Sequence, residues 1–154
     1  MTRVPFLDVP QSDRRPSHQE KERGKAVLTI RTDRPEAEVG LYDGQKQLAY
    51  EKWPAHRELS DTIHKKINEI LDLLSISLEE VQGIVVFKGP GSFTGLRIGL
   101  SVANGLAYSL NIPVVAAAGP DWLKVGLKSF LEEKNDIIAL PEYGSPANVS
   151  KPRK

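Results

Sequence analysis

The chain has 154 residues, no cysteine and a formal net charge of +1 at neutral pH. This length permits one domain with a real core, and the lack of cysteine excludes disulfides, thiolate nucleophiles and cysteine-ligated zinc. No apolar run approaches the roughly 20 residues that a membrane-spanning helix needs, and the N-terminus is too polar for a signal peptide. We therefore expect a cytoplasmic protein that makes no contact with a membrane.

The charge is distributed unevenly along the chain. Residues 1–25 carry six Lys or Arg against four Asp or Glu, and the last four residues carry three positive charges. Residues 26–150 hold 12 basic and 16 acidic side chains, so the folded body is not a basic nucleic-acid surface. The basic ends are either contacts for RNA phosphates or solvated termini, and short charge runs favour the second reading.

The first 25 residues contain three prolines and little apolar content. This composition predicts a disordered leader. A short docking peptide at residues 4–10, VPFLDVP, is the alternative.

Three strands are predicted after the leader, at residues 26–31, 37–42 and 47–53. A turn at residues 33–35 separates the first two, and Asp-Gly at residues 43–44 makes a hairpin between the second and third. These signals predict an antiparallel meander.

An amphipathic helix is predicted over residues 58–74, because apolar residues recur there at helical spacing. His56 and His64 flank its start, but they are eight residues apart and cannot form a metal pair on adjacent turns. Lone histidines without partners do not build a metal site.

The centre of the chain is an apolar strand at 83–87, a turn at 89–95 and a helix at 95–110. Glycine and proline impose the turn, and Ser92 or Thr94 is expected to cap the helix. One face of this helix is expected to pack on the sheet and a second to meet another helix, of this chain or of a partner. The apolar residues of the two faces are Leu96, Leu100, Ala103, Ala107 and Leu110, and Ile98, Val102 and Leu106.

The turn has two readings, an anion cradle and a tight structural turn. A helix N-terminus attracts anions, but neither GxxxxGK[ST] nor the dinucleotide fingerprint GxGxxG is present after Gly89. Chemistry alone therefore favours the structural turn.

The rest of the chain is expected to add a buried strand at 113–118 and a helix at 122–133 capped by Asp121. Residues 137–140 are expected to be ordered, and Tyr143 to pin the tail to the body.

The segment GPGSFTGLRIGL, residues 89–100, resembles the signature of the TsaB family, non-catalytic subunits of the bacterial machinery that makes threonylcarbamoyladenosine (t6A) in tRNA. The likeness extends from about residue 27 to residue 123. It implies an actin-like, Hsp70-like (RNase H-like) α/β lobe. We predict a five-stranded mixed sheet in the order 3-2-1-4-5 with helices on its faces.

The resemblance also implies a domain plan and partners. We expect a leader at 1–25, a first lobe at 26–140 and a tail at 141–154, with the family's second lobe absent. The partner would be a TsaD-type catalytic paralogue, with a TsaE-type ATPase in the same complex, a homodimer through the same helices as a further option, and tRNA touched only indirectly.

The first strand departs from the family. It usually ends Ile-Asp-Thr, and here Arg31 stands in place of the aspartate. An arginine cannot hold a magnesium ion, and the partner's His-x-x-x-His metal motif has no counterpart in this chain. We therefore expect no cofactor on this chain, with ATP and metal on the partner.

The predicted function is a scaffold subunit for threonylcarbamoyl transfer. The alternatives are a nucleotide-binding or peptidase-like enzyme, which lacks any constellation of nucleophile and base, and a stand-alone tRNA binder, which the acidic body disfavours. No catalytic residue and no metal ligand is assigned. The motif residues are Gly89, Pro90, Gly91, Ser92, Phe93, Thr94, Gly95 and Arg97; the predicted partner interface is Ile63, Ile67, Leu71, Ile98, Gly99, Val102 and Leu106.

Overall fold

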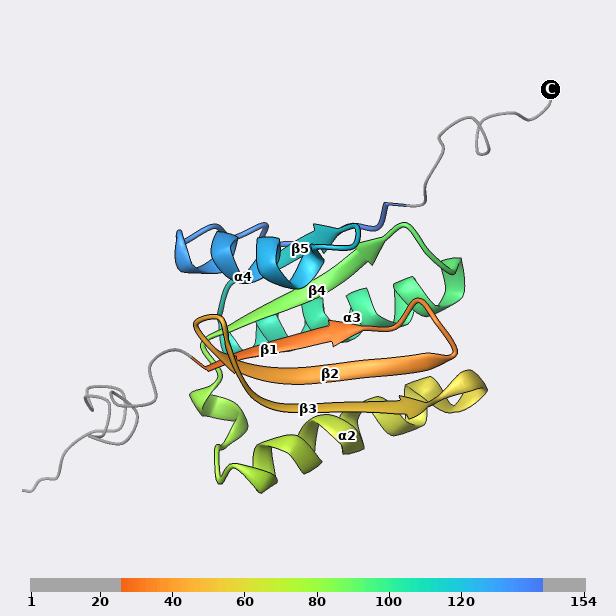
Figure 1. Ribbon diagram of the computed structural model, residues 1–154, viewed down its shortest axis with the longest axis horizontal. Coiled ribbons are helices and arrows are strands. Elements are labelled where there is room, and N and C mark those ends of the chain that lie inside the picture. Colours follow the sequence, from red (N-terminus) through yellow and green to blue (C-terminus); the bar gives the residue numbers. More distant parts are fainter. Residues whose placement is uncertain (1–25, 143–154) are drawn as a thin grey trace, which may run out of the picture.

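The structure is a computed structural model that describes residues 26–142. The predicted leader and Tyr143 lie outside the described residues. The elements, labelled in Figure 1, are β1 (Ala26–Arg31), β2 (Glu36–Asp43), β3 (Lys46–Pro54), η2 (His56–Glu58), α2 (Leu59–Leu73), η3 (Leu78–Glu80), β4 (Gly83–Gly89), α3 (Phe93–Leu110), β5 (Val114–Ala118) and α4 (Trp122–Leu131).

The five strands form one mixed sheet in the order β3-β2-β1-β4-β5, which confirms the predicted order. β1, β2 and β3 pair antiparallel, whereas β4 pairs parallel with both β1 and β5. The two parallel pairings require crossovers, which α2 and α3 supply.

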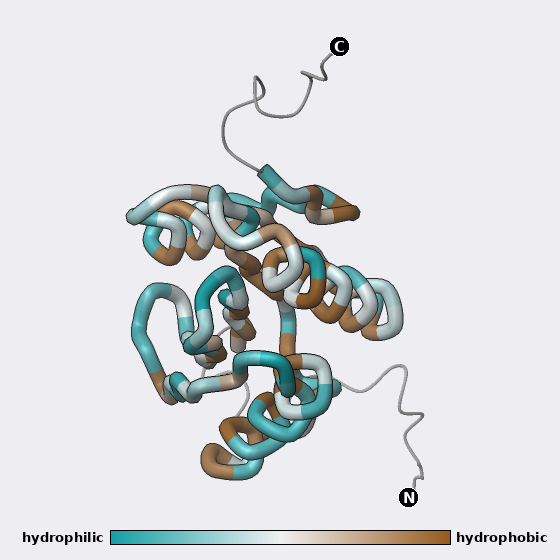
Figure 2. The backbone as a smooth tube through the Cα atoms, turned by 90° about the vertical axis from the view of Figure 1, so that its right-hand side faces the viewer, coloured by the Kyte–Doolittle hydropathy of each residue, from teal (hydrophilic) through white to brown (hydrophobic). Residues whose placement is uncertain are grey.

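One face of the sheet packs against α2 and α3. The register places alternate residues of neighbouring strands on this face, such as Val39, Ile30 and Val86 in a row across β2, β1 and β4. All three are at most 1% exposed. Hydrophobic and hydrophilic residues alternate along the helices (Figure 2), so each helix turns an apolar side to the sheet.

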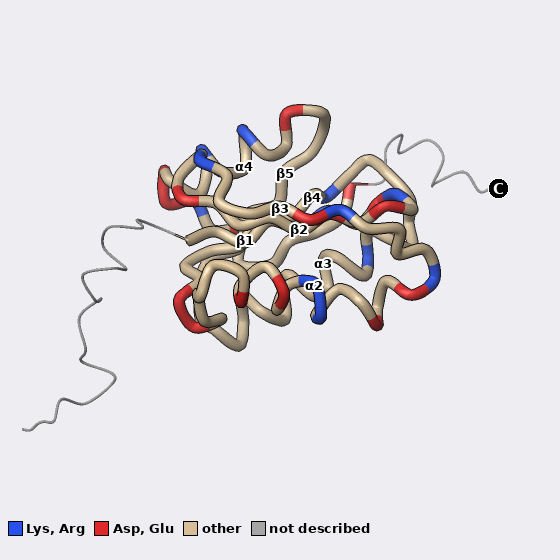
Figure 3. Tube along the Cα trace, turned by 60° about the horizontal axis from the view of Figure 1, so that its bottom comes forward, with Lys and Arg blue, Asp and Glu red and all other residues tan. Residues whose placement is uncertain are grey.

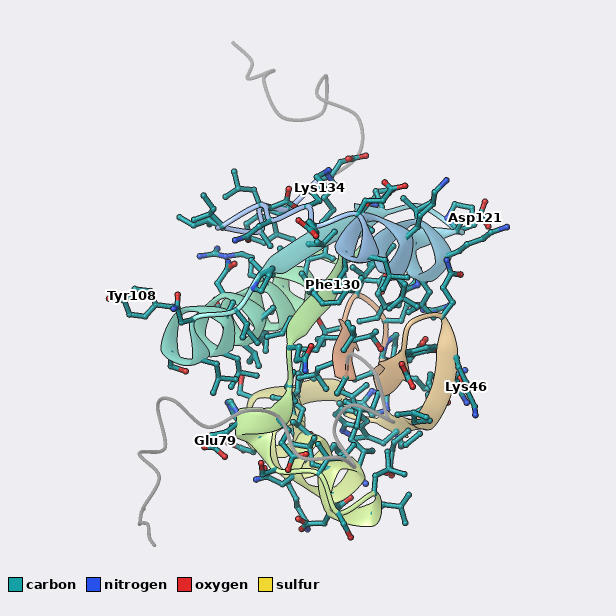
Figure 4. The ribbon with its side chains drawn as sticks, turned by 90° about the vertical axis from the view of Figure 1, so that its left-hand side faces the viewer. Lys46, Glu79, Tyr108, Asp121, Phe130 and Lys134 are labelled. Carbon is teal, nitrogen blue, oxygen red and sulfur yellow. The ribbon has the colours of Figure 1, made fainter. Side chains whose placement is uncertain are left out.

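The opposite face is covered by α4 only over β4 and β5. Phe130 points from α4 toward the sheet (Figure 4) and occupies the space beside Gly83, while Gly126 lets α4 approach Val85. Over β2 and β3, Tyr50 and Glu38 lie on this face. Burial and a hydrogen bond to Glu38 raise the pKa of Tyr50 to about 12.

The helix bounds differ slightly from those predicted. α3 begins at Phe93, so Ser92 is its N-cap residue, but its hydroxyl makes no capping hydrogen bond. Asp121 is likewise the N-cap residue of α4 without a side-chain cap, and α4 ends at Leu131. Both capping predictions are therefore right in position and wrong in mechanism.

The loop between β1 and β2 packs on the first turns of α3. The Thr32 hydroxyl donates a hydrogen bond to the Gly95 carbonyl, 2.6 Å away. A Cβ atom at Gly95 or Gly99 would overlap Thr32, and one at Gly91 would overlap Asp33. Gly95 therefore lets the backbone of the loop approach the helix, while Gly91 and Gly99 make room for the side chains of Asp33 and Thr32.

The burial of α2 leads to a matched pair of stability predictions. Ile63 is fully buried, whereas Leu73, on the same helix, is 76% exposed. We expect Ile63→Ala to lower the free energy of unfolding by about 2–5 kcal/mol and Leu73→Ala to change it by less than about 0.5 kcal/mol. Urea denaturation followed by circular dichroism measures both, and equal effects would contradict the packing described here.

The close contact between Thr32 and α3 generates a second pair. We expect Gly99→Ala to destabilise the fold by about 1–3 kcal/mol, since the added methyl must displace Thr32. Nothing lies within 4 Å of a Cβ at Gly105 in the same helix, so Gly105→Ala should stabilise by about 0.5–1 kcal/mol. Thermal melts of the two variants give the sign directly, and a stabilising Gly99→Ala would be the contrary result.

Candidate functional site

The glycine-rich turn follows the end of β4. Gly89 has φ of +121°, a conformation that strongly favours glycine. Its neighbour Lys88 accepts a backbone hydrogen bond from Glu142, 2.7 Å from nitrogen to oxygen. The chain therefore returns to this turn after α4. Pro90, Ser92 and Thr94 are exposed along the turn and the helix start.

An ion pair stands beside the turn. The Arg31 Nε is 2.7 Å from Oδ1 of Asp33, whose side chain is only 5% exposed. The Arg31 guanidinium also lies 3.9 Å from the centre of the Phe87 ring. The Asp33 carboxylate is thus neutralised by a cation that is itself held by an aromatic ring.

A hollow of about 230 Å³ opens between the β1–β2 loop and the turn; it is lined by Thr32, Asp33, Arg34, Pro35, Ala55, His56, Leu59, Ser92, Thr94, Gly95 and Ile98. The glycines of the turn are accounted for by the packing of Thr32 and Asp33. These contacts support the structural turn over the anion cradle. Among residues 26–142, no group of three or more His, Asp or Glu is placed to hold a metal ion.

A larger groove, of about 460 Å³, runs between α2 and α3. We call it the α2–α3 groove; it is lined by Ser60, His64, Phe93, Thr94, Arg97, Ile98, Ser101 and Val102. The Arg97 guanidinium lies 5.1 Å from the centre of the Phe93 ring. The groove therefore combines three apolar side chains with a polar rim that carries one permanent positive charge.

The predicted interface divides into two groups. Ile98, Val102 and Leu106 are half-buried along the outer side of α3, beside or in the groove. Ile63, Ile67 and Leu71 are 0%, 3% and 3% exposed, because they face this chain's own sheet. Gly99 is buried against Thr32. The interface prediction is wrong for these four residues, since a group buried in its own chain cannot contact a partner.

The enzyme alternative finds little support in the groove. His64 lies near the hydroxyls of Ser60 and Ser101 along the lining, but no hydrogen bond joins it to a hydroxyl within the described part of the chain. Ser92 shares the lining of the hollow with two possible bases, His56 and Asp33, but no side-chain hydrogen bond joins it to either one within residues 26–142, and Asp33 is paired with Arg31. Within the described residues, neither the groove nor the hollow therefore brings a nucleophile into hydrogen-bond contact with a base.

Two contacts near the site were not anticipated from sequence. The Asn104 side chain donates to the Ala139 carbonyl at 3.0 Å and accepts from the Ala139 amide at 2.8 Å. This clamp fixes the returning chain against α3, although 35 residues separate the pair. The second unanticipated contact is that of Thr32 with α3. In the sequence, only the position of Thr32 directly after β1 could have suggested it.

Among the helices of residues 26–142, none has the length and apolar character of a membrane span.

Comparisons with known proteins agree with this geometry. A family model described as TsaD, tRNA N6-adenosine threonylcarbamoyltransferase, matches residues 54–118. The TsaB protein of Escherichia coli, named for tRNA threonylcarbamoyladenosine biosynthesis, is 33% identical over 60% of this chain and 39% of its own length. The TsaB protein of Haemophilus influenzae is 39% identical over 49% of this chain and 31% of its own length.

A solved structure shares the fold. YeaZ from Pseudomonas aeruginosa superposes with a TM-score of 0.59 and 27% identity over 71% of this chain and half of its own. The mixed sheet in the order 3-2-1-4-5 is an actin-like, RNase H-like arrangement. The matched region spans about a third of the length of the curated relatives. Over that region, the sequence is similar to curated TsaB proteins, and the chain shares the fold of YeaZ.

Proposed function

We propose that this chain is a non-catalytic scaffold subunit that supports a TsaD-type partner in transferring a threonylcarbamoyl group to tRNA adenosine. The names of the curated relatives support a place in t6A biosynthesis, and the matching family model bears the name of the transferase. In this proposal, the group transfer occurs on the partner, in the cytoplasm.

The proposal is supported chiefly by the outer side of α3. Ile98, Val102 and Leu106 are spaced by four residues and form one apolar stripe. The stripe is only half-buried by this chain, since α2 covers its edge and leaves the groove open. An apolar strip with a polar rim is the anatomy of a protein interface. A helix of the partner is the element that would complete it.

The charges around the groove suit a protein partner better than RNA. Figure 3 shows basic and acidic residues interspersed over the described body, without a one-signed field. Phosphate recognition needs clustered Lys or Arg. We therefore propose that tRNA is contacted through the partner, and that a TsaE-type ATPase joins through the same complex. A homodimer through the same stripe is a further option when no partner is present.

The chemistry near the turn supports the absence of catalysis. Arg31 replaces the carboxylate that could hold a metal, and it already neutralises the neighbouring Asp33. The space beside Gly91 and Gly95 is occupied by Asp33 and Thr32 of this chain, which supports a structural role for the turn. We therefore place ATP and metal on the partner.

A charge placed in the stripe should weaken the complex. We expect Val102→Glu to reduce affinity for the TsaD-type protein of the same organism at least tenfold, because binding would bury an unpaired carboxylate. Isothermal titration calorimetry measures the affinity, and light scattering gives the mass of the complex.

Val125→Glu is the matched control. It makes the same substitution on α4, at a residue 51% exposed on the opposite face of the sheet. It should leave affinity unchanged. Equal loss in both variants, or none in Val102→Glu while its melting temperature stays near that of the parent, would exclude the stripe as the interface. A chain that forms no complex at all would refute the scaffold function.

Catalysis is tested separately. We expect the purified chain to release no phosphate from ATP above the buffer rate, with or without magnesium, in a coupled assay. Ser92→Ala is the control, because it removes the exposed hydroxyl at the turn. Turnover that disappears in Ser92→Ala would establish an enzyme instead.

A further inference from the structure

The first 25 residues have an uneven composition. Apart from Met1, their large apolar side chains all lie within Val4–Pro10, sequence VPFLDVP. Residues 11–25 contain no Val, Ile, Leu, Phe, Tyr or Trp, and eight of these fifteen residues are charged. A uniformly polar tail would lack such a cluster. An apolar heptapeptide on a polar tether is the pattern of a tethered ligand for an apolar groove.

The α2–α3 groove offers a receiving surface. Phe93, Ile98 and Val102 give it an apolar lining, and Phe93 is 53% exposed. Arg97 forms no ion pair with any carboxylate of the described residues. The heptapeptide contains one charged residue, Asp8, whose sign is opposite. The chemistry of the segment thus matches the chemistry of the groove.

The tether has a suitable length. Ala26 begins β1, and Thr32, just past the end of β1, contacts Gly95 in the first turn of α3. The groove therefore opens about one strand length, roughly 20 Å, from the point where the tether is attached. A flexible chain of fifteen residues spans roughly 20–23 Å on average. Effective concentration is highest when these lengths agree, and it then reaches the millimolar range.

We propose that Val4–Pro10 binds in the α2–α3 groove of its own chain, with Phe6 and Leu7 on the apolar lining and Asp8 facing Arg97. The docked segment would cover Ile98 and Val102. If the proposed scaffold function holds, the segment is then a tethered competitor of the TsaD-type partner. At an effective concentration of about 1 mM, segment dissociation constants of about 1 and 0.1 mM would weaken partner binding about twofold and tenfold.

The docking itself is tested in the full chain without any partner. Because the sequence contains no cysteine, Gln11→Cys provides a single site for a nitroxide label next to the heptapeptide. We expect selective loss of amide NMR intensity at residues 60–64 and 93–102, relative to the reduced label. Phe6→Ser with Leu7→Ser should abolish this loss, and Val125→Glu, on the far face of the sheet, should preserve it.

Other outcomes would overturn the proposal. Weak broadening spread over the whole surface, or strong broadening elsewhere, would exclude docking in the groove. A mixture of equal amounts of spin-labelled chains and unlabelled, isotope-enriched chains tests for binding between copies. Broadening of the groove residues in that mixture, without broadening inside a single labelled chain, would show that the segment binds a second copy.

The partner measurement separates the two proposals. With docking present, the Phe6→Ser and Leu7→Ser chain should bind the TsaD-type protein two- to tenfold more tightly. Unchanged affinity in that variant would refute the competition. A chain that shows docking but never binds the partner would retain the intramolecular contact and lose the scaffold function.

Discussion

The contact of Thr32 with α3 is the constraint on which the rest of this fold depends. It joins the end of β1 to the start of α3 through a hydrogen bond at 2.6 Å, and it favours glycine at positions 95 and 99, while the neighbouring Asp33 does so at position 91. Once α3 is held there, Leu96, Leu100 and Ala103 lie against the sheet and the stripe of Ile98 and Val102 is left on the outside. The glycine-rich segment therefore acts first as a packing device. Its functional consequence is the outward orientation of one helix face.

The sequence predicted the architecture well because the signals were local and repeated. The turn signals between the first three strands, the β-branched run of β4 and the helical period of α2 each indicate an element independently, and the strand order follows from short connections and right-handed crossovers. The boundaries moved by only one or two residues. Caps were less predictable, since a hydroxyl at the N-cap position, such as Ser92, bonds the helix only if its rotamer allows it.

The candidate site was predicted only in part, for a physical reason. Periodicity shows that a helix has an apolar side, but not whether its own sheet or another protein covers that side. Ile63, Ile67 and Leu71 are buried in the core of this chain, whereas Val102, which is also apolar, is only half-buried. Gly99 was read as a place for a partner's backbone, and Thr32 of the same chain fills it. The Asn104 clamp on Ala139 depends on two segments meeting only after folding.

The ion pair beside the turn connects these observations with function. A carboxylate at the end of β1 would face the turn as a free charge, ready for a cation. In this chain Arg31 stands there, stacks on Phe87 and pairs with Asp33, so that the two charges at the end of β1 are paired with each other. The Asp33 carboxylate is therefore not free to attract a cation, which agrees with the proposal that ATP and metal belong to the partner. The apolar stripe of α3 is instead only half-buried. Covering it with a helix or peptide of complementary shape would remove apolar area from water, which is favourable. Under the two proposals above, the stripe is the surface for which a partner and residues 4–10 of the same chain would compete.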